Sequence, residues 1–343
     1  MLDGLAHYPA VVARVEWVPL GHAGGFSGSS LWRGQLHGER LFVLKAWQHD
    51  YPAERLETIH RWMTYARRNG DLSFVPEVVP SESGRSVVEA AGRVWDVTAW
   101  LPGIADFSAE PNDAKLMASC QAIAKLHRAW VPRQVPLAPC PGVERRILLL
   151  RGFDPNVTIL KIDDPKLRDL LTSALPTLRR LVPLALAVLE PWRVKLGPLQ
   201  PCLCDVWHDH VLFTGNQVSG VIDYGSMKLD HPAVDLARWL GDTVGDDRER
   251  IELGLTAYRD AGGPWNPDAE FVSCLDATGV ICAVIHWIHR LSARNQPHES
   301  EQVLQRVQKL TTRLATIRLQ TPTSAARIES LTILSPRPAR GEP

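Results

Sequence analysis

The chain has 343 residues, with 38 Lys and Arg balancing 38 Asp and Glu, so its formal net charge is zero. This balance gives no overall attraction to nucleic acid or to anionic lipid, and we expect neither a nucleic-acid nor a membrane partner. The length suits two packed lobes, and the 45% hydrophobic and 22% charged fractions are ordinary for a globular protein.

The six cysteines and the N-terminal residues predict the compartment. The cysteines are scattered through a large chain, and Cys202 and Cys204 have no second cysteine pair at zinc-site spacing. The first residues include Asp3 and show no cleavage-site pattern, so we expect no secretory signal. The most apolar run, 181–189, is too short to span a bilayer. These features favour a reducing, cytoplasmic setting.

The first hundred residues predict a β-rich lobe. Apolar runs alternate with turn-forming residues, and the His37-Gly38-Glu39 turn joins two of the runs as a hairpin. One helix interrupts them at 52–68, where apolar residues recur at helical spacing before Asn69-Gly70 ends the pattern. The predicted strands are 11–18, 30–36, 40–47, 86–90 and 93–100.

After a break at 101–103 the pattern becomes helical. We therefore predict a lobe at 1–100, a linker at 101–103, a helical lobe at 104–320 and a disordered tail at 321–343, an α+β fold class. Residues 202–222 form a loop-and-strand insert rich in His and Asp. The predicted helices are 113–130, 165–189 with breaks or kinks at Pro176 and Pro183, 232–240, 248–260, 269–294 and 299–318.

A Gly/Ser-rich turn in the first lobe is a candidate phosphate-binding loop. Glycine lets the backbone approach a ligand closely, and successive N–H groups can surround phosphate oxygens, although such a turn is more often only a turn. The candidate nucleotide-binding residues of this turn are Gly24, Gly25, Ser27, Gly28 and Ser29.

Lys45 follows this turn on a predicted strand. Its apolar neighbours allow two orientations: the side chain points into the lobe, where an unpaired charge is costly unless an anion receives it, or it faces outward as an ordinary strand lysine. Glu57 on the next helix is the candidate carboxylate partner, in the manner of the strand Lys and helix Glu of kinases, with Glu54 as the competing candidate.

The second lobe carries the most specific pattern. Asp205 is followed five positions later by His210, then by an apolar run ending in Asp223-Tyr224-Gly225, and then by D-H-P-A-V-D-L-A-R at 230–238. This order resembles the kinase-like aminoglycoside phosphotransferases, choline kinases and homoserine kinases. Segments 100–103 and 122–130 resemble the inter-lobe linker and the L-H-containing helix of that family, so the resemblance spans about residues 15–300.

The resemblance implies a protein-kinase-like two-lobed fold, with a small antiparallel β lobe and a larger helical lobe. It also implies transfer of the γ-phosphate of ATP to a hydroxyl of a small molecule. Asp205 would be the catalytic base, Asp223 would hold Mg²⁺, and Lys45 would hold the phosphates beneath the Gly/Ser turn. Asp235 would brace the catalytic loop as a structural residue.

Two departures from the family pattern affect this prediction. The usual H-G-D is Leu203-Cys204-Asp205 here, and His210 stands where an Asn would offer a metal a neutral oxygen. Imidazole suits softer metals better than it suits Mg²⁺. His210 would thus be a ligand for a metal such as Mn²⁺ or Zn²⁺, or Asp223 alone would run a one-metal site, or the site would be degenerate; we expect the one-metal site.

Two other functions stay open from the residues alone. The first is a catalytically silent, nucleotide-binding regulator, suggested by the departures just described. The second is a metal-dependent hydrolase built on His208 and His210, although no third metal-ligand pattern completes it. Trp207, beside Asp205, is a candidate to line the acceptor pocket. Neither the acceptor nor the oligomeric state can be read from the sequence.

Overall fold

The chain divides into two compact units. The structure, a computed structural model, describes residues 2–20, 28–157, 159, 162–292 and 300–319. The first unit comprises Met1–Glu144 and Lys195–Asp276, and the second comprises Arg145–Val194 and Ala277–Pro343. The lobe boundaries at 100 and 103 stay predictions, and the predicted tail, 321–343, lies outside the described residues.

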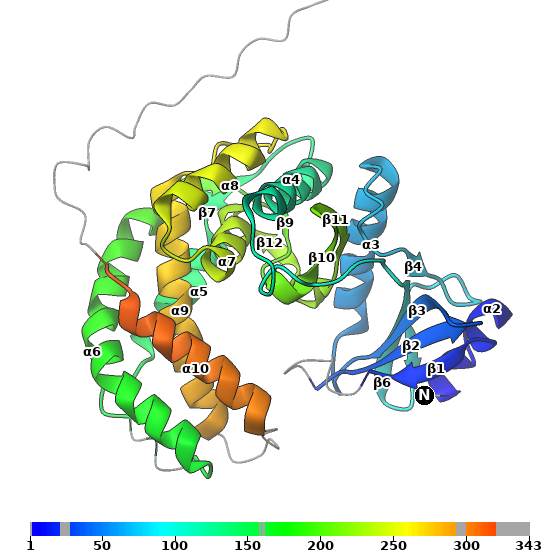
Figure 1. Ribbon diagram of the computed structural model, residues 1–343, viewed down its shortest axis with the longest axis horizontal. Helices are drawn as coiled ribbons and strands as arrows, with labels where there is room; N and C mark the ends of the chain where they lie inside the picture. The colour runs from blue at the N-terminus through cyan, green and yellow to red at the C-terminus, as the bar shows by residue number, and fades with distance from the viewer. Residues whose placement is uncertain (1, 21–27, 158, 160–161, 293–299, 320–343) are drawn as a thin grey trace, which may run out of the picture. The chain divides into compact units, whose positions relative to one another are not determined.

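A six-stranded antiparallel sheet forms the N-terminal part of the first unit (Figure 1). Its path runs β1-β2-β3-β6-β4, and β5 also pairs with β6. The central strand β3 thus has partners on both sides, which places Lys45 in register with Leu31 and with Asp96. The strands are β1 Glu16–Pro19, β2 Ser30–Leu36, β3 Glu39–Ala46, β4 Val78–Val79, β5 Val88–Ala90 and β6 Arg93–Ala99.

The β2–β3 turn follows the prediction, but the start of the chain does not. His37 and Gly38 have φ of 50° and 85°, the pair of positive values that a tight two-residue hairpin turn requires. The run 11–18 is not one strand, because α2 (Ala10–Ala13) begins directly after Pro9 and precedes β1. Val12 of α2 is fully buried in the core over the sheet. A second short helix, α1 (Leu2–Leu5), opens the chain.

The helices of the first unit begin at side-chain caps where the sequence supplies them. Asn112 accepts a hydrogen bond from the backbone of Lys115 at the start of α4, and Asp247 accepts one from Arg250 at the start of α8. Both helices span the predicted residues, and α4 packs against α7 and α8. The bounds are α3 Ala53–Asn69, α4 Asp113–Trp130, α7 Ala233–Thr243 and α8 Arg248–Asp260.

A second hairpin, β10 (Val211–Thr214) and β11 (Gln217–Val221), lies against the segment predicted as a linker. Ile104 and Phe213 exchange backbone hydrogen bonds of 3.0 and 2.9 Å. Gly103 has φ of 103°, and a Cβ there would lie 2.7 Å from the carbonyl oxygen of Phe213. Only glycine fits this close approach, so segment 101–103 is fixed to the hairpin. The remaining short strands are β7 Leu137–Pro139, β8 Leu196–Pro198, β9 Gln200–Cys202 and β12 Lys228–Asp230.

The second unit is helical in its described part. α6 (Pro165–Arg193) is one continuous helix through Pro176 and Pro183, so the predicted breaks are absent, and it packs against α10 (Ser300–Thr316). α9 (Ala269–Ser292) begins in the first unit and continues into the second, as does α5 (Pro141–Arg151), which the sequence analysis missed.

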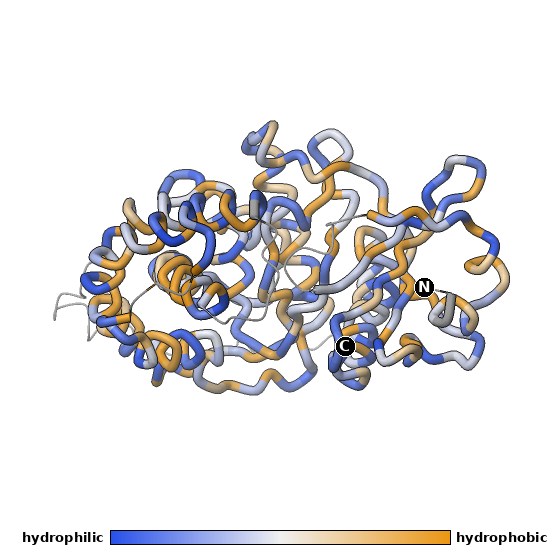
Figure 2. Tube along the Cα trace, turned by 90° about the horizontal axis from the view of Figure 1, so that it is seen from below, coloured by the Kyte–Doolittle hydropathy of each residue, from blue (hydrophilic) through white to orange (hydrophobic). Residues whose placement is uncertain are grey.

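Two of these helices, α6 and α9, are long and apolar enough to cross a membrane by length and composition. Of their most apolar stretches, 44% and 61% respectively is buried within the protein, and a core helix passes the same test. Hydrophobic and hydrophilic residues are interspersed along the described trace (Figure 2). Every strand pairing among the described residues is antiparallel, so the predicted α+β class is confirmed.

Candidate active site

The β10–β11 hairpin brings the two ends of the predicted catalytic segment together. The loop from Asp205 to His210, closed by a short 3₁₀ turn η2 (His208–His210), leads into β10, and Asp223 follows β11. The backbone N–H of Ile222 donates to the carbonyl of His210 at 2.9 Å. The antiparallel pairing therefore sets Asp223 beside the loop that carries Asp205.

Asp205 is held by an arginine that the sequence analysis did not single out. Nε of Arg238 in α7 donates to Oδ1 of Asp205 at 3.1 Å, and 45% of the Asp205 side chain is exposed. The preceding Cys204 has φ of 64°, a left-handed conformation that glycine adopts without strain. Cys204 therefore keeps the backbone shape that the family's glycine would have, at a cost of about 1 kcal/mol.

Lys45 and Asp223 form an ion pair. Nζ of Lys45 lies 3.1 Å from Oδ1 of Asp223, and only 14% of the lysine side chain is exposed. Burial alone would raise the pKa of Asp223, but the neighbouring charges, that of Lys45 first, and the hydrogen bonds from Lys45 and the Gly225 backbone together outweigh it, so the pKa falls below its usual range. Asp223 has φ of 59°, a second left-handed residue at the site. The strand lysine and the strand-end aspartate thus meet in a charged pair.

The aromatic ring of Trp47 packs against the Lys45–Asp223 ion pair. The Lys45 ammonium lies 4.0 Å from the ring centroid of Trp47, within cation–π distance. A Cβ on Gly225 would lie 2.8 Å from the same ring, so the position two residues after Asp223 must be glycine. This close contact explains why Gly225 follows the strand end.

The prediction that Glu57 holds Lys45 is wrong. Glu57 pairs with Arg85 instead, at 3.0 Å. The helix α3 presents His60 to the sheet, where its Nε2 lies 3.3 Å from Asp96, the register partner of Lys45. Glu57 is thus engaged with Arg85, and His60 links α3 to the sheet.

Part of the Gly/Ser turn can be placed. Gly24, Gly25 and Ser27 lie outside the described residues. Gly28 has φ of 72°, and its carbonyl accepts a hydrogen bond from Arg93 at 3.2 Å. Ser29 directly precedes β2. The C-terminal end of the turn is therefore anchored to the sheet.

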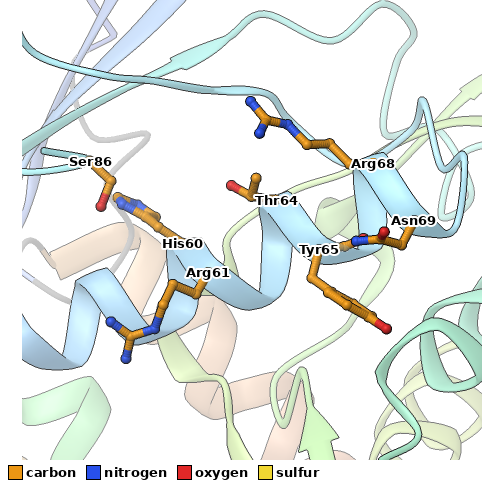
Figure 3. Close-up of a pocket in the computed structure, with 7 residues that line it drawn as sticks. All are labelled: His60, Arg61, Thr64, Tyr65, Arg68, Asn69 and Ser86. Carbon is orange, nitrogen blue, oxygen red and sulfur yellow. The ribbon is translucent and has the colours of Figure 1, made fainter. Parts of the chain in front are cut away.

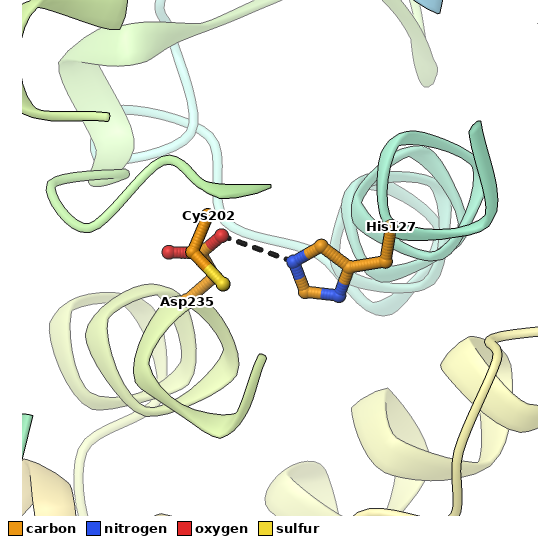
Figure 4. A group of neighbouring side chains, drawn as sticks. All are labelled: His127, Cys202 and Asp235. Atoms are coloured by element: carbon orange, nitrogen blue, oxygen red, sulfur yellow. Dashed lines mark hydrogen bonds and ion pairs between the residues drawn. The ribbon is translucent and has the colours of Figure 1, made fainter. Parts of the chain in front are cut away.

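Asp235 of α7 ties three segments of the first unit together. Its Oδ2 accepts from the backbone of Leu203 at 2.8 Å, and its Oδ1 accepts from Cys204 at 2.7 Å. Nε2 of His127 in α4 lies 3.0 Å from the same carboxylate, as the dashed line in Figure 4 marks. Asp235 and His127 are fully buried. These bonds give the residues just before Asp205 a fixed backbone position.

His127, Cys202 and Asp235 lie close enough to one another to hold a metal ion, but the hydrogen bonds of His127 and Asp235 are those of a structural network (Figure 4). Both oxygens of Asp235 are occupied, and Nδ1 of His127 lies 3.0 Å from the hydroxyl of Tyr258. Burial, followed by the charge of Asp235, raises the pKa of the Cys202 thiol well above its usual range, so the thiolate that a metal requires is disfavoured.

His210 is engaged within its own loop. Its Nδ1 lies 2.7 Å from the carbonyl oxygen of Asp205, and its Nε2 accepts a hydrogen bond from Nε1 of Trp207 at 2.7 Å. Its Nε2 also lies 3.7 Å from Oδ2 of Asp223. His210 therefore lies beside Asp223 with both ring nitrogens already bonded.

The model of the phosphotransferase enzyme family matches residues 20–271, which covers strands β2 to β6 of the sheet, the catalytic segment and Asp235. The chain belongs to this family. No curated protein sequence matches significantly. The resemblance predicted from the motifs is thus confirmed by a match over most of the chain.

Three solved phosphotransferase structures show the same fold. Spectinomycin phosphotransferase in complex with ADP and spectinomycin has a TM-score of 0.62 and 14% identity, over 88% of this chain and 92% of that one. A microcompartment-associated aminopropanol kinase has a TM-score of 0.58 and 17% identity, over 90% and 93%. An amicoumacin kinase in complex with AMP-PNP and Ca²⁺ has a TM-score of 0.56 and 13% identity, over 89% and 90%. The predicted kinase-like fold is confirmed.

The contacts of His208 in this phosphotransferase do not favour the alternative function of a metal-dependent hydrolase. Asp242 in α7 accepts from the backbone N–H of His208 at 3.0 Å and also contacts its Nδ1. Nε2 of His208 lies 3.4 Å from Asp209. His208 thus fixes the loop to α7. A small hollow beside it, of about 120 Å³, is lined by Phe107, Ser108, Pro111, His208, Asp242 and Thr243.

A second, larger hollow has a volume of about 330 Å³ and is lined by none of the candidate active-site residues described above (Figure 3). It is a shallow depression along one stripe of α3. It contains none of the predicted site residues, and Arg61 and Arg68 point to different sides of the helix in the close-up. Its lining residues are His60, Arg61, Thr64, Tyr65, Arg68, Asn69 and Ser86.

Replacing Asp235 should destabilise the phosphotransferase strongly. Asp235→Asn leaves one oxygen where two accept hydrogen bonds, and sets an amide N–H₂ against a backbone donor in a fully buried site. We expect a loss of about 3 kcal/mol in the free energy of unfolding, as for a broken buried network. Equilibrium urea unfolding measures it. Asp113→Asn, which removes an exposed pair with Arg250, is the control and should change stability by less than about 1 kcal/mol.

His231 should make the fold sensitive to acid. Burial lowers the pKa of His231 to about 4 from its ordinary 6.5, and its Nδ1 accepts from the backbone of Ala233. The unfolded chain takes up the proton below pH 6.5, whereas the folded chain does so only near pH 4. This stability is therefore present above pH 6.5 and lost as the pH falls toward 4, on the order of 3 kcal/mol in all.

Urea unfolding between pH 4 and 7.5 tests this, with His231→Asn as the comparison. Asn keeps an oxygen acceptor but takes up no proton, so the variant should lose less stability between pH 6.5 and 4 than the unmodified protein. An equal loss in both proteins would contradict the assignment to His231.

Proposed function

We propose that this phosphotransferase moves the γ-phosphate of ATP to a hydroxyl group of a small molecule. The observation that carries the proposal is the approach of Lys45 to Asp223, at 3.1 Å, on one side of the β10–β11 hairpin, with Asp205 in the loop that leads into it. Phosphoryl transfer needs charge neutralisation and positioning more than covalent chemistry, and these residues supply both.

Asp205 acts as the catalytic base in this proposal. Arg238 bonds only Oδ1, so Oδ2 remains to accept the proton of an attacking hydroxyl. The ion pair also fixes the direction of the carboxylate. The backbone N–H bonds that Asp235 accepts hold the preceding residues in place, so the base has little freedom to move.

Asp223 fits a hard metal ion. Its carboxylate is partly exposed, ionised beside Lys45 and made of the oxygen ligands that Mg²⁺ prefers, usually together with phosphate oxygens and water. Bound there, Mg²⁺ would neutralise charge on the β- and γ-phosphates. Mn²⁺ is the alternative ion, and His210 is the neighbouring candidate ligand.

Lys45 binds the phosphates of ATP in this proposal. In the structure its charge is balanced by Asp223 and by the face of Trp47, and an incoming phosphate would take over part of that role. Gly28 and Ser29, with Gly24, Gly25 and Ser27 before them, would cover the phosphates through backbone N–H groups.

The acceptor is a small molecule that carries a hydroxyl group. The similar solved structures, by their names, act on spectinomycin, aminopropanol and amicoumacin, so the fold serves several acceptors and does not select one. The zero net charge gives no overall attraction to nucleic acid or to a membrane, and we propose neither as a partner. We propose a cytoplasmic location, where ATP and Mg²⁺ are supplied.

ADP release from ATP and Mg²⁺ tests this function. A panel of amino alcohols, sugars, hydroxy amino acids and aminoglycosides should contain at least one acceptor that raises ADP release above the hydrolysis seen with ATP alone. The phosphorylated product, identified by mass spectrometry, would confirm transfer. ATP binding without ADP release for any acceptor would instead favour the silent regulator.

A further inference from the structure

The hydrogen bonds of His210 fix where its proton lies. The indole N–H of Trp207 is a donor only, so Nε2 of His210 must present its lone pair to it. The carbonyl oxygen of Asp205 is an acceptor only, so Nδ1 must carry the hydrogen. In this arrangement Nδ1 of His210 carries the hydrogen, and the lone pair of Nε2 accepts the hydrogen bond from Trp207.

That lone pair is also the one that could bind a metal. Nε2 lies 3.7 Å from Oδ2 of Asp223. A divalent ion bonded to an imidazole nitrogen and a carboxylate oxygen at about 2.0–2.2 Å from each would fit between atoms at this separation. Nε2 of His210 and Oδ2 of Asp223 are therefore close enough to bind one metal ion together, but Nε2 already accepts a hydrogen bond from the N–H of Trp207.

Trp207 is held in this position from two sides. Its ring meets His210 edge to face, with centroids 5.4 Å apart, and the guanidinium of Arg238 lies 5.9 Å from its centroid. The backbone N–H of His210 also donates to the carbonyl of Trp207 at 2.8 Å, closing the 3₁₀ turn. The indole N–H is thus aimed at Nε2 by the loop itself.

We propose that Trp207 determines the metal specificity of the site by blocking Nε2 of His210. With the nitrogen occupied, Asp223 offers a metal only oxygen, which favours Mg²⁺ over softer ions that prefer imidazole. The inference rests on the proposed function for its metal site, and it assigns Trp207 a role in ion choice in place of contact with the acceptor.

Co²⁺ titration of the nucleotide-free protein tests the block. Co²⁺ takes imidazole ligands readily, and its visible absorption reports nitrogen ligation without any turnover. Trp207→Phe keeps the ring and removes the N–H, so it should bind Co²⁺ about fivefold to tenfold more tightly than the unmodified protein, the equivalent of one hydrogen bond. Trp207→Leu, which also lacks the N–H, should show the same gain.

The double variant Trp207→Phe with His210→Asn locates the effect. It should lose the gain, because the nitrogen ligand is gone. Unchanged Co²⁺ affinity in both single variants, a gain that persists without His210, or nitrogen-ligated Co²⁺ already present in the unmodified protein would each overturn the proposal. The proposed function is tested separately by ATP and Mg²⁺ with the unmodified protein, so the two ideas can fail independently.

Discussion

Asp205→Asn is expected to lower ATP-dependent phosphoryl transfer by about a thousandfold. A positioned base contributes roughly 10²–10⁴-fold to the rate, and Asn cannot accept the proton of the acceptor hydroxyl. Asn keeps the size of the side chain and an oxygen toward Nε of Arg238, so the loop should stay in place. ADP release under saturating ATP measures the rate, and thermal unfolding with ATP measures binding.

Asp209→Asn is the matched control for this variant. Asp209 lies four residues along the same loop, is more than half exposed and contacts only His208 among the interactions described for it. It should keep most of the activity. The decisive comparison is between rate and binding: Asp205→Asn should change the apparent affinity for ATP by no more than about twofold. Retained turnover in Asp205→Asn would remove this residue from the role of base.

Asp223→Asn is expected to abolish the response to Mg²⁺ and reduce transfer by a thousandfold or more. The change removes the charge that a metal needs and leaves Lys45, 14% exposed, without its carboxylate. A ligand present at a hundred times its dissociation constant stabilises a fold by about 2.7 kcal/mol, and this metal-dependent part should disappear. Thermal unfolding with ATP, with and without Mg²⁺, measures it.

Glu57→Gln separates this account from the arrangement of protein kinases. Glu57 pairs with Arg85 and not with Lys45, so its replacement should cost less than about 1 kcal/mol and leave the Mg²⁺-dependent stabilisation in place. A loss of ATP binding in Glu57→Gln as large as that in Asp223→Asn would mean that the glutamate moves to Lys45 when the nucleotide binds.

The sequence predicted the elements whose signals are local. The helices α4 and α8 match their predicted bounds because an apolar stripe and a capping Asn or Asp define each of them. The helix α2 was missed because its four residues span only about one helical turn, too few for an apolar stripe to repeat. Pro176 and Pro183 suggested breaks or kinks in α6, but the helix runs through both without a break along its buried face.

The order of the motifs predicted the candidate site residues, but it did not predict which side chains contact them. Asp205, His210 and Asp223 could be found because their order and spacing along the chain resemble those of kinase-like phosphotransferases. The bond of Arg238 to Asp205 could not be predicted, because it depends on packing between α7 and the loop. Trp207 was predicted to line the acceptor pocket, but its bond to His210 depends on the conformation of the loop itself. Glu57 was misassigned because a helix can turn any of several residues toward a sheet, and here it turns His60.

Thermal unfolding with ATP, with Mg²⁺, with both and with neither is the measurement that tests the central claim most directly. The unmodified protein should gain a clear rise in unfolding temperature when ATP and Mg²⁺ are present together, and little from either one alone. ATP stabilisation that needs no metal would favour a silent nucleotide binder. No response to ATP under any of the four conditions would contradict the assignment of Lys45, Asp205 and Asp223 to an ATP site.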